Sequence, residues 1–252
     1  MTNTQLKEFL DEKYNQYNTP NFIETDPIQI PHSFSKKEDI EISALLTATI
    51  AWGNRKMIIR NAQRIVRLLE NEPHEFILNA SDDEIETLSG FVHRTFNYID
   101  LQFFLKSLRN IYQNHGGLEA VFSNYPTDML KALIHFREVF FEIPFPERTS
   151  RHVSNVAKNS AAKRLNMFLM WMVRKDNRGV HFGLWDKIKP SALFLPLDVH
   201  TGNVGRKLGL LNRKQSDWKA VVEITDNLRK FDANDPVKYD FALFGLGVFE
   251  KF

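Results

Sequence analysis

The chain has no cysteine among its 252 residues. This absence excludes disulfide bonds, zinc sites built on Cys ligands and Cys-ligated iron–sulfur clusters. No apolar run approaches the roughly 20 residues that a helix needs to span a bilayer. The polar N-terminal segment MTNTQLKEFLDEKYNQY does not resemble a signal peptide. We therefore expect a cytoplasmic protein with no membrane partner.

Recognisable metal-binding patterns are also missing. The eight His residues are scattered, and the sequence contains neither an HExxH motif nor a paired His–carboxylate motif. We expect no metal and no cofactor.

Alternating strand patterns are scarce, whereas helical periodicity recurs along the chain. The best strand candidate, PSALFLPLD, contains two prolines, which do not suit a paired strand. Apolar residues at helical spacing predict helices over several segments, and Ser216 is the expected N-cap of one late helix. We predict an all-α fold of about ten helices, including helices over residues 4–17, 39–52, 55–69, 98–112, 127–141, 161–174 and 216–230.

A long connection over residues 142–160 divides this pattern. It contains two prolines and several Ser and Asn residues, and long loops in compact domains are often functional. We expect one unit over residues 1–252 made of two helical lobes. One lobe covers about 35–145 and the other combines 1–34 with 146–252. A monomer is expected.

Charge is unevenly distributed although the net charge is only +2. Residues 147–214 contain fourteen Lys or Arg and four Asp or Glu, and 14 − 4 leaves +10. A basic block of this kind is typical of a protein that binds a polyanion. The alternative is a solvated surface balanced by acidic neighbours in the fold.

Asp198 stands where a leucine-rich segment meets a small basic helix, in LPLDVHTGNVGRKLGLL. This is the position of an N-cap, where a carboxylate accepts hydrogen bonds from free backbone N–H groups. Capping alone explains the residue. A capped carboxylate also stays ionised, so it can stabilise a developing cation beside it.

Lys163 is the candidate for a second functional group. It opens the apolar segment KRLNMFLMWMV, and a lysine beside apolar surface loses hydration, which makes its amine a better nucleophile. The alternative is a lysine at a helix end whose stem lies along apolar surface. Its neighbour Arg164 is expected to contact solvent or phosphate.

Three separated segments resemble the helix-hairpin-helix (HhH-GPD) DNA glycosylase superfamily, which includes endonuclease III and the 8-oxoguanine glycosylases. They are EISALLTATIAWGNRKMIIRNAQRIVRLL, AAKRLNMFLMWMV, and LDVHTGNVGRKLGL with the later YDFALFGLGVF. The resemblance spans about 40–250 and is thin between these segments. The chain also looks like an uncharacterised bacterial branch of that superfamily. The fold implied is a two-lobed helical glycosylase-like fold with a degenerate hairpin.

The resemblance also assigns roles by position. Lys163 matches the nucleophile of bifunctional members, and Asp198 matches their essential carboxylate. His200 falls at the aspartate-x-histidine position, where a structural role is expected. Thr49 falls at a pocket position, and Trp52 is a candidate for stacking on a base. Basic residues flanking the two catalytic candidates are expected to contact nucleic acid, and these are Arg148, Arg151, Lys158, Arg164, Arg206 and Lys207.

The segment before Lys163 departs from the superfamily. The usual turn is rich in glycine and offers backbone N–H groups to a DNA phosphate, whereas here it reads NVAKNSAAK. The spacing from Lys163 to Asp198 is 35 residues, longer than in endonuclease III and more like the archaeal 8-oxoguanine glycosylase branch.

The function implied is base-excision repair by a DNA glycosylase, with or without AP-lyase activity. The expected partner is duplex DNA containing a damaged base such as 8-oxoguanine. Two alternatives remain open at this point: a non-catalytic nucleic-acid-binding protein on the same fold, and a helical protein-interaction scaffold.

Overall fold

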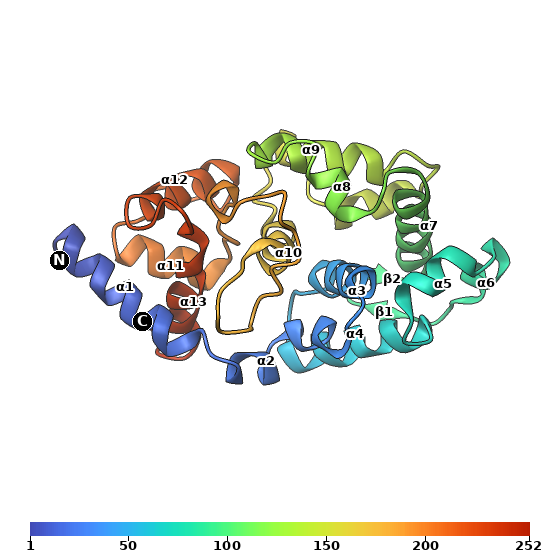
Figure 1. The fold of residues 1–252 in the computed structure, drawn as a ribbon, viewed down its shortest axis with the longest axis horizontal. Coiled ribbons are helices and arrows are strands. Elements are labelled where there is room, and N and C mark those ends of the chain that lie inside the picture. Colours follow the sequence, from blue (N-terminus) through green and yellow to red (C-terminus); the bar gives the residue numbers. More distant parts are fainter. The chain divides into compact units, whose positions relative to one another are not determined.

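The computed structural model describes residues 1–252 (Figure 1). It contains thirteen α-helices, six short 3-10 helices and one two-stranded hairpin. The all-α prediction is confirmed, but the expected number of helices was too low. The additional helices are mainly one- to two-turn segments such as Asn21–Thr25 and Leu118–Phe122, which are too short to show helical periodicity.

The chain divides into two compact units. The first, here called the terminal unit, combines Met1–Glu24 with Asn155–Phe252. The second, here called the middle unit, is Thr25–Ser154. The long connection of residues 142–160 therefore contains the point where the chain passes from one unit to the other.

Most helices of the middle unit pack against one another around an apolar core. Helix α7 packs on α5, α6, α8 and α9, and α3 packs on α4 and α5. In chain order its elements are η1 (Pro27–Gln29), η2 (Pro31–Ser33), α3 (Lys37–Thr49), α4 (Arg55–Leu68), α5 (Pro73–Asn79), α6 (Asp82–Thr87), β1 (Val92–His93), β2 (Phe96–Asn97), α7 (Tyr98–Asn114), α8 (Leu118–Phe122), α9 (Met129–Phe140) and η3 (Glu147–His152).

Phenylalanine rings fill much of the middle unit's core. Phe104 and Phe140 meet edge to face with ring centroids 4.7 Å apart, and Phe122 stacks on Phe136 at 4.6 Å. All four side chains are fully buried. Aromatic pairs at such separations add to the free energy of burial, so these rings hold α7, α8 and α9 together.

The hairpin β1–β2 is the only sheet in the protein. Val92 pairs with Asn97 and His93 with Phe96, and Arg94 in the turn has a left-handed backbone with φ of 55°. Two-residue strands are too short to show alternation, which is why the sequence pattern did not indicate them. No strand forms over PSALFLPLD, where Pro190–Ala192 is a 3-10 helix.

The terminal unit joins the two ends of the chain. Helix α13 packs against both α1 and α11. Its elements are α1 (Asn3–Tyr17), α2 (Asn21–Thr25, at the unit boundary), η4 (Val156–Lys158), α10 (Lys163–Val173), η5 (Pro190–Ala192), α11 (Val199–Lys207), α12 (Trp218–Arg229), η6 (Pro236–Tyr239) and α13 (Asp240–Val248). The N-cap of α12 is Asp217, so the prediction of Ser216 was wrong by one residue. Asp217 is the capping residue because its carboxylate accepts a hydrogen bond from the Ala220 N–H at 3.1 Å.

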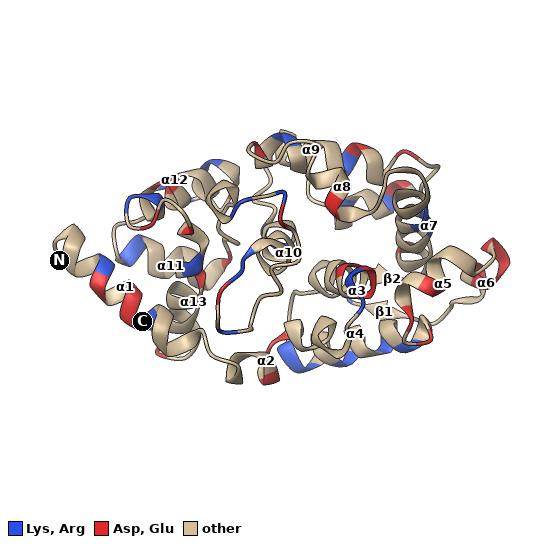
Figure 2. Ribbon diagram, viewed as in Figure 1, with Lys and Arg blue, Asp and Glu red and all other residues tan.

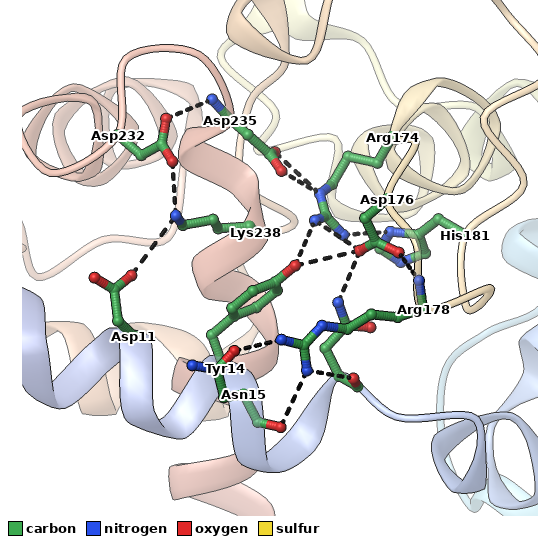
Figure 3. A network of polar contacts seen from close by, with 11 residues as sticks. Asp11, Tyr14, Asn15, Arg174, Asp176, Arg178, His181, Asp232, Asp235 and Lys238 are labelled. Atoms are coloured by element: carbon green, nitrogen blue, oxygen red, sulfur yellow. Dashed lines mark hydrogen bonds and ion pairs between the residues drawn. The ribbon is translucent and has the colours of Figure 1, made fainter.

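A buried polar network ties α1 to the segment after α10 (Figure 3). Arg174, whose side chain is 1% exposed, donates through Nε to both Asp235 oxygens at 3.0 and 2.9 Å. Its other nitrogens meet His181 Nδ1 at 2.9 Å, Asp176 at 3.1 Å and the Tyr14 hydroxyl at 3.3 Å. Because every guanidinium nitrogen has a partner, this buried charge anchors the C-terminal end of α10.

No helix is both long and apolar enough to cross a bilayer.

Candidate functional site

The segment before Lys163 forms a tight hairpin without glycine. Asn155 caps η4 by accepting from the Lys158 N–H at 3.3 Å, and the Ser160 N–H donates to the Asn155 carbonyl at 3.2 Å. Two non-glycine residues have a left-handed backbone, Asn159 with φ of 64° and Ala162 with φ of 48°. Asn tolerates this region well, whereas Ala does not. The turn therefore reaches a glycine-type geometry with one strained residue directly before Lys163.

Contacts to α12 hold this hairpin in place. Asn159 Nδ2 donates to Asp217 Oδ2 at 2.9 Å, and the Trp218 N–H donates to the Asn159 carbonyl at 3.1 Å. Arg213 Nε also donates to Asp217 at 2.6 Å. Hydrogen bonds from Arg213 first, and also from Ala220 and Asn159, hold the pKa of Asp217 well below its usual range. Asp217 thus remains ionised while it fastens the turn to the start of α12.

Lys163 is the first residue of α10 and is half-buried. Its Nζ makes no ion pair and lies 3.3 Å from Met167 Sδ, one turn along the helix. No side chain caps this helix, and its first turn contains no acid. The unbonded N–H groups and the helix dipole favour negative charge at such an end. Burial lowers the pKa of the neighbouring Arg164 to about 10, which still leaves its guanidinium charged at neutral pH.

Asp198 caps α11, as its position in the sequence predicted. Leu195, Pro196 and Leu197 before it are buried, and the carboxylate is half-buried at the end of this apolar segment. Oδ1 accepts from the Thr201 N–H at 2.8 Å. The cap uses one oxygen in a hydrogen bond to the helix, which fixes the orientation of the carboxylate.

Lys163 and Asp198 belong to the same unit, and no ion pair joins them. His200, two residues into α11, is exposed. A methyl group on Gly247 would lie 3.0 Å from His200 Cβ, so α13 approaches α11 closely beside this histidine. His200 thus lies beside Gly247 of α13 while its side chain remains exposed.

The basic residues predicted to contact nucleic acid differ in their exposure and in their hydrogen bonds within the protein. Arg151, Lys158 and Lys207 are exposed. Arg206 is half-buried and donates to the carbonyls of Arg213 and Lys214 at 3.0 and 2.8 Å. Lys158 and Lys207 therefore face solvent, Arg151 is exposed but donates through Nε to the Arg148 carbonyl at 2.9 Å, and Arg206 is held by its own loop.

Arg148 is held by a buried carboxylate in the middle unit. Its Nη1 lies 2.6 Å from Asp100, whose side chain is 0% exposed. Asp100 also accepts from Thr149 Oγ1 at 2.7 Å and from the Asn97 N–H at 2.9 Å, and His152 Nε2 lies 3.3 Å away. Burial alone raises the pKa of Asp100, but the hydrogen bonds from these neighbours outweigh it and lower the pKa to about 2.

Thr49 and Trp52, the predicted pocket residues, also lie in the middle unit. Thr49 ends α3 and is buried, and Trp52 is half-buried in the turn that follows. The indole meets the His93 ring edge to face at 4.9 Å and stacks on the His152 ring at 6.2 Å. His93 in turn contacts Asn61 at 2.8 Å. Trp52 therefore belongs to a cluster with two imidazoles.

Sequence reasoning missed the cluster of Asp100, His152, His93 and Asn61. One local signal existed, because Asn97 and Asp100 have capping-box spacing and form that box at the start of α7. The contacts to Thr149 and His152 lie 49 or more residues away in the chain, and no local pattern indicates them. No group of three or more His, Cys, Asp or Glu side chains is placed to hold a metal ion.

A family model described as "Protein of unknown function (DUF2400)" matches residues 26–249. The chain belongs to the DUF2400 family. No curated protein and no solved structure matches it. The DUF2400 match includes the glycine-free hairpin, Lys163, Asp198 and the Asp100 cluster. Both the terminal-unit site and the middle-unit cluster thus lie within the region that defines the family.

Proposed function

We propose that this DUF2400 chain is a DNA glycosylase of the helix-hairpin-helix type that removes a damaged base from duplex DNA. Lys163 is the nucleophile and Asp198 is the stabilising carboxylate. The observation that carries the proposal is the position of Lys163, which follows a hairpin with two left-handed residues and begins an uncapped helix.

The start of α10 supports the proposal because no side chain caps it and its first backbone N–H groups have no partner within the helix. The N–H groups of Lys158, Asn159 and Ser160 donate within the hairpin, to the Asn155 and Val156 carbonyls. The end of the helix, and not the hairpin itself, therefore offers donors to an anion. This end of α10 also carries the helix dipole and the guanidinium of Arg164. A DNA phosphate is an anion of suitable charge for this end of the helix.

The chemistry follows from an amine and a carboxylate. The Lys163 amine attacks C1′ of the damaged nucleotide as the glycosidic bond breaks, and the base leaves with the bonding electron pair and takes up a proton. Asp198 stabilises the positive charge that develops on the sugar. Loss of a proton from the attached nitrogen and opening of the sugar ring give a Schiff base between Lys163 and the sugar. Removal of a C2′ proton then releases the 3′ phosphate by β-elimination.

Borohydride trapping tests this mechanism directly. Borohydride reduces a Schiff base to a stable amine, so the protein is expected to form a covalent complex with duplexes carrying 8-oxoguanine or an abasic site. Lys163→Gln is expected to abolish the complex. Lys175→Gln is the matched control, because Lys175 is an exposed lysine just beyond the other end of α10 and its loss is expected to leave trapping unchanged.

Three outcomes would overturn the proposal. Undiminished trapping by a folded Lys163→Gln variant would remove Lys163 from the mechanism. Salt-sensitive DNA binding without base release from any lesion duplex would favour a non-catalytic nucleic-acid-binding protein. Absence of DNA binding even at low salt would leave a helical protein-interaction scaffold.

A further inference from the structure

Helix α4 of the middle unit carries an unusual distribution of charge. Its fourteen residues, RKMIIRNAQRIVRL, contain five Lys or Arg and no Asp or Glu. The rest of the middle unit, residues 25–154 without α4, has nine basic and seventeen acidic residues, and 9 − 17 gives −8. A helix of charge +5 therefore stands in an otherwise acidic unit (Figure 2).

Four of these cations share one exposed face. At about 3.6 residues per turn, Lys56, Arg60, Arg64 and Arg67 fall within about 80° of arc. All four are exposed. The opposite side of the helix is buried through Ile58, Asn61, Ala62, Ile65 and Val66. We call Lys56, Arg60, Arg64 and Arg67 the α4 basic face.

None of the four is neutralised by an acid. The middle unit's acids instead pair with other cations, as in Lys37–Glu119, Lys106–Glu86 and Arg148–Asp100. Arg64 donates only to the Gly90 carbonyl at 2.9 Å, and its guanidinium lies 5.7 Å from the Phe91 ring centre. Glu70 and Glu72 lie beyond the C-terminal end of α4. Because acids are in excess in this unit, four unpaired cations in one row point to an external anion.

We propose that the α4 basic face binds the phosphate backbone of duplex DNA. Successive cations at four-residue spacing lie about 6 Å apart, so the row from Lys56 to Arg64 spans about 12 Å. Duplex DNA carries one negative charge per about 1.7 Å of its axis, so several phosphates face a row of this length. Three of the four cations are guanidinium groups, which form two hydrogen bonds to a phosphate.

An anionic membrane fits this face less well. Helices that bind membrane surfaces insert their apolar side among the lipids. The apolar side of α4 is already buried in the middle unit, with Ile58 5% and Ile65 1% exposed. The remaining attraction to lipid is purely electrostatic, which makes binding to anionic vesicles an outcome that the experiment must separate from binding to DNA.

This inference rests on the proposed function only for the choice of duplex DNA, because it uses neither Lys163 nor Asp198.

The test measures the affinity of the full chain for an undamaged duplex across a range of salt concentrations. Replacing all four residues of the α4 basic face by Gln is expected to lower the log–log salt slope by about 3.6, since each phosphate contact contributes about 0.9. A control removes the same charge elsewhere by replacing Lys131, Lys219, Lys230 and Lys251 with Gln, all of them exposed.

The results separate the two proposals. A reduced slope in the α4 variant, an unchanged slope in the control and weak binding to vesicles containing anionic lipid support the α4 basic face. An unchanged slope in a folded α4 variant, an equal loss in the control, or preference for vesicles over DNA would overturn it. Absence of borohydride trapping with an α4-dependent slope retained would instead remove the glycosylase chemistry alone. Trapping retained with an unchanged slope would remove the α4 basic face alone.

Discussion

Asn159 and Asp217 are joined by a hydrogen bond of 2.9 Å that links the hairpin before Lys163 to the N-terminus of α12. One carboxylate thereby caps a helix, accepts from the left-handed Asn159 and pairs with Arg213. The position of Lys163, the candidate nucleophile, thus depends on Asp217, which lies 54 residues further along the chain. Local strain in the turn is sustained by these contacts, as is typical of functional sites.

The strain at Ala162 predicts a stabilising substitution. A left-handed conformation costs a residue with a Cβ about 1–2 kcal/mol, and glycine escapes that cost while losing about 0.5–1 kcal/mol through the entropy of its unfolded state. Ala162→Gly is therefore expected to raise the free energy of unfolding by up to about 1 kcal/mol, as measured by urea denaturation. Ala161→Gly, at a neighbour without positive φ, should lower it. Equal destabilisation by both variants would show that Ala162 is unstrained.

Asp198 allows capping to be separated from chemistry. Asn is as good an N-cap as Asp, so Asp198→Asn is expected to leave thermal stability nearly unchanged, whereas Asp198→Ala should cost about 1 kcal/mol. If the negative charge acts on the sugar, both variants should lose base release. An Asp198→Asn variant that excises bases as fast as the unsubstituted chain would restrict this residue to capping.

Asp100 predicts a pH dependence at the acid end. Its pKa falls from 3.8 to about 2 in the folded chain, so its ionised form stabilises the fold fully above about pH 4. That contribution, about 2 kcal/mol, is lost as the pH falls through about 2. The difference in unfolding free energy between the chain and Asp100→Asn should therefore shrink on acidification. An NMR titration of the Asp100 carboxyl with a midpoint near 4 would contradict this.

Arg174 predicts a large loss of stability. Its guanidinium is 1% exposed and pairs with Asp235 and Asp176. Arg174→Ala leaves these carboxylates without their partner and is expected to lower the free energy of unfolding by about 3–5 kcal/mol. The neighbouring exposed Lys175 provides the control, since Lys175→Ala should change stability by less than about 0.5 kcal/mol. Similar small effects for both variants would show that the network in Figure 3 does not hold the unit together.

Helix positions were largely predictable because periodicity is local. The segment 55–69 is α4 at Arg55–Leu68, and 98–112 is α7 at Tyr98–Asn114. The boundaries were less certain where two capping residues adjoin, as with Ser216 and Asp217. The excess of basic residues over 147–214 could be counted from the sequence. The sequence did not show which of these cations are exposed, because packing decides that: Arg174 is buried in an ion pair, whereas Lys158 is exposed.

Amino-acid order alone was enough to establish the helical class and the cap at Asp198, because a cap joins atoms only three residues apart. Packing decided which side chains meet across the chain. Arg148 meets Asp100 over 48 residues, and Arg174 meets Asp235 over 61. The left-handed backbone at Ala162 likewise has no signature in composition. Such contacts arise only when distant helices are brought together, since burial of their apolar faces, and not local preference, determines which charges become neighbours.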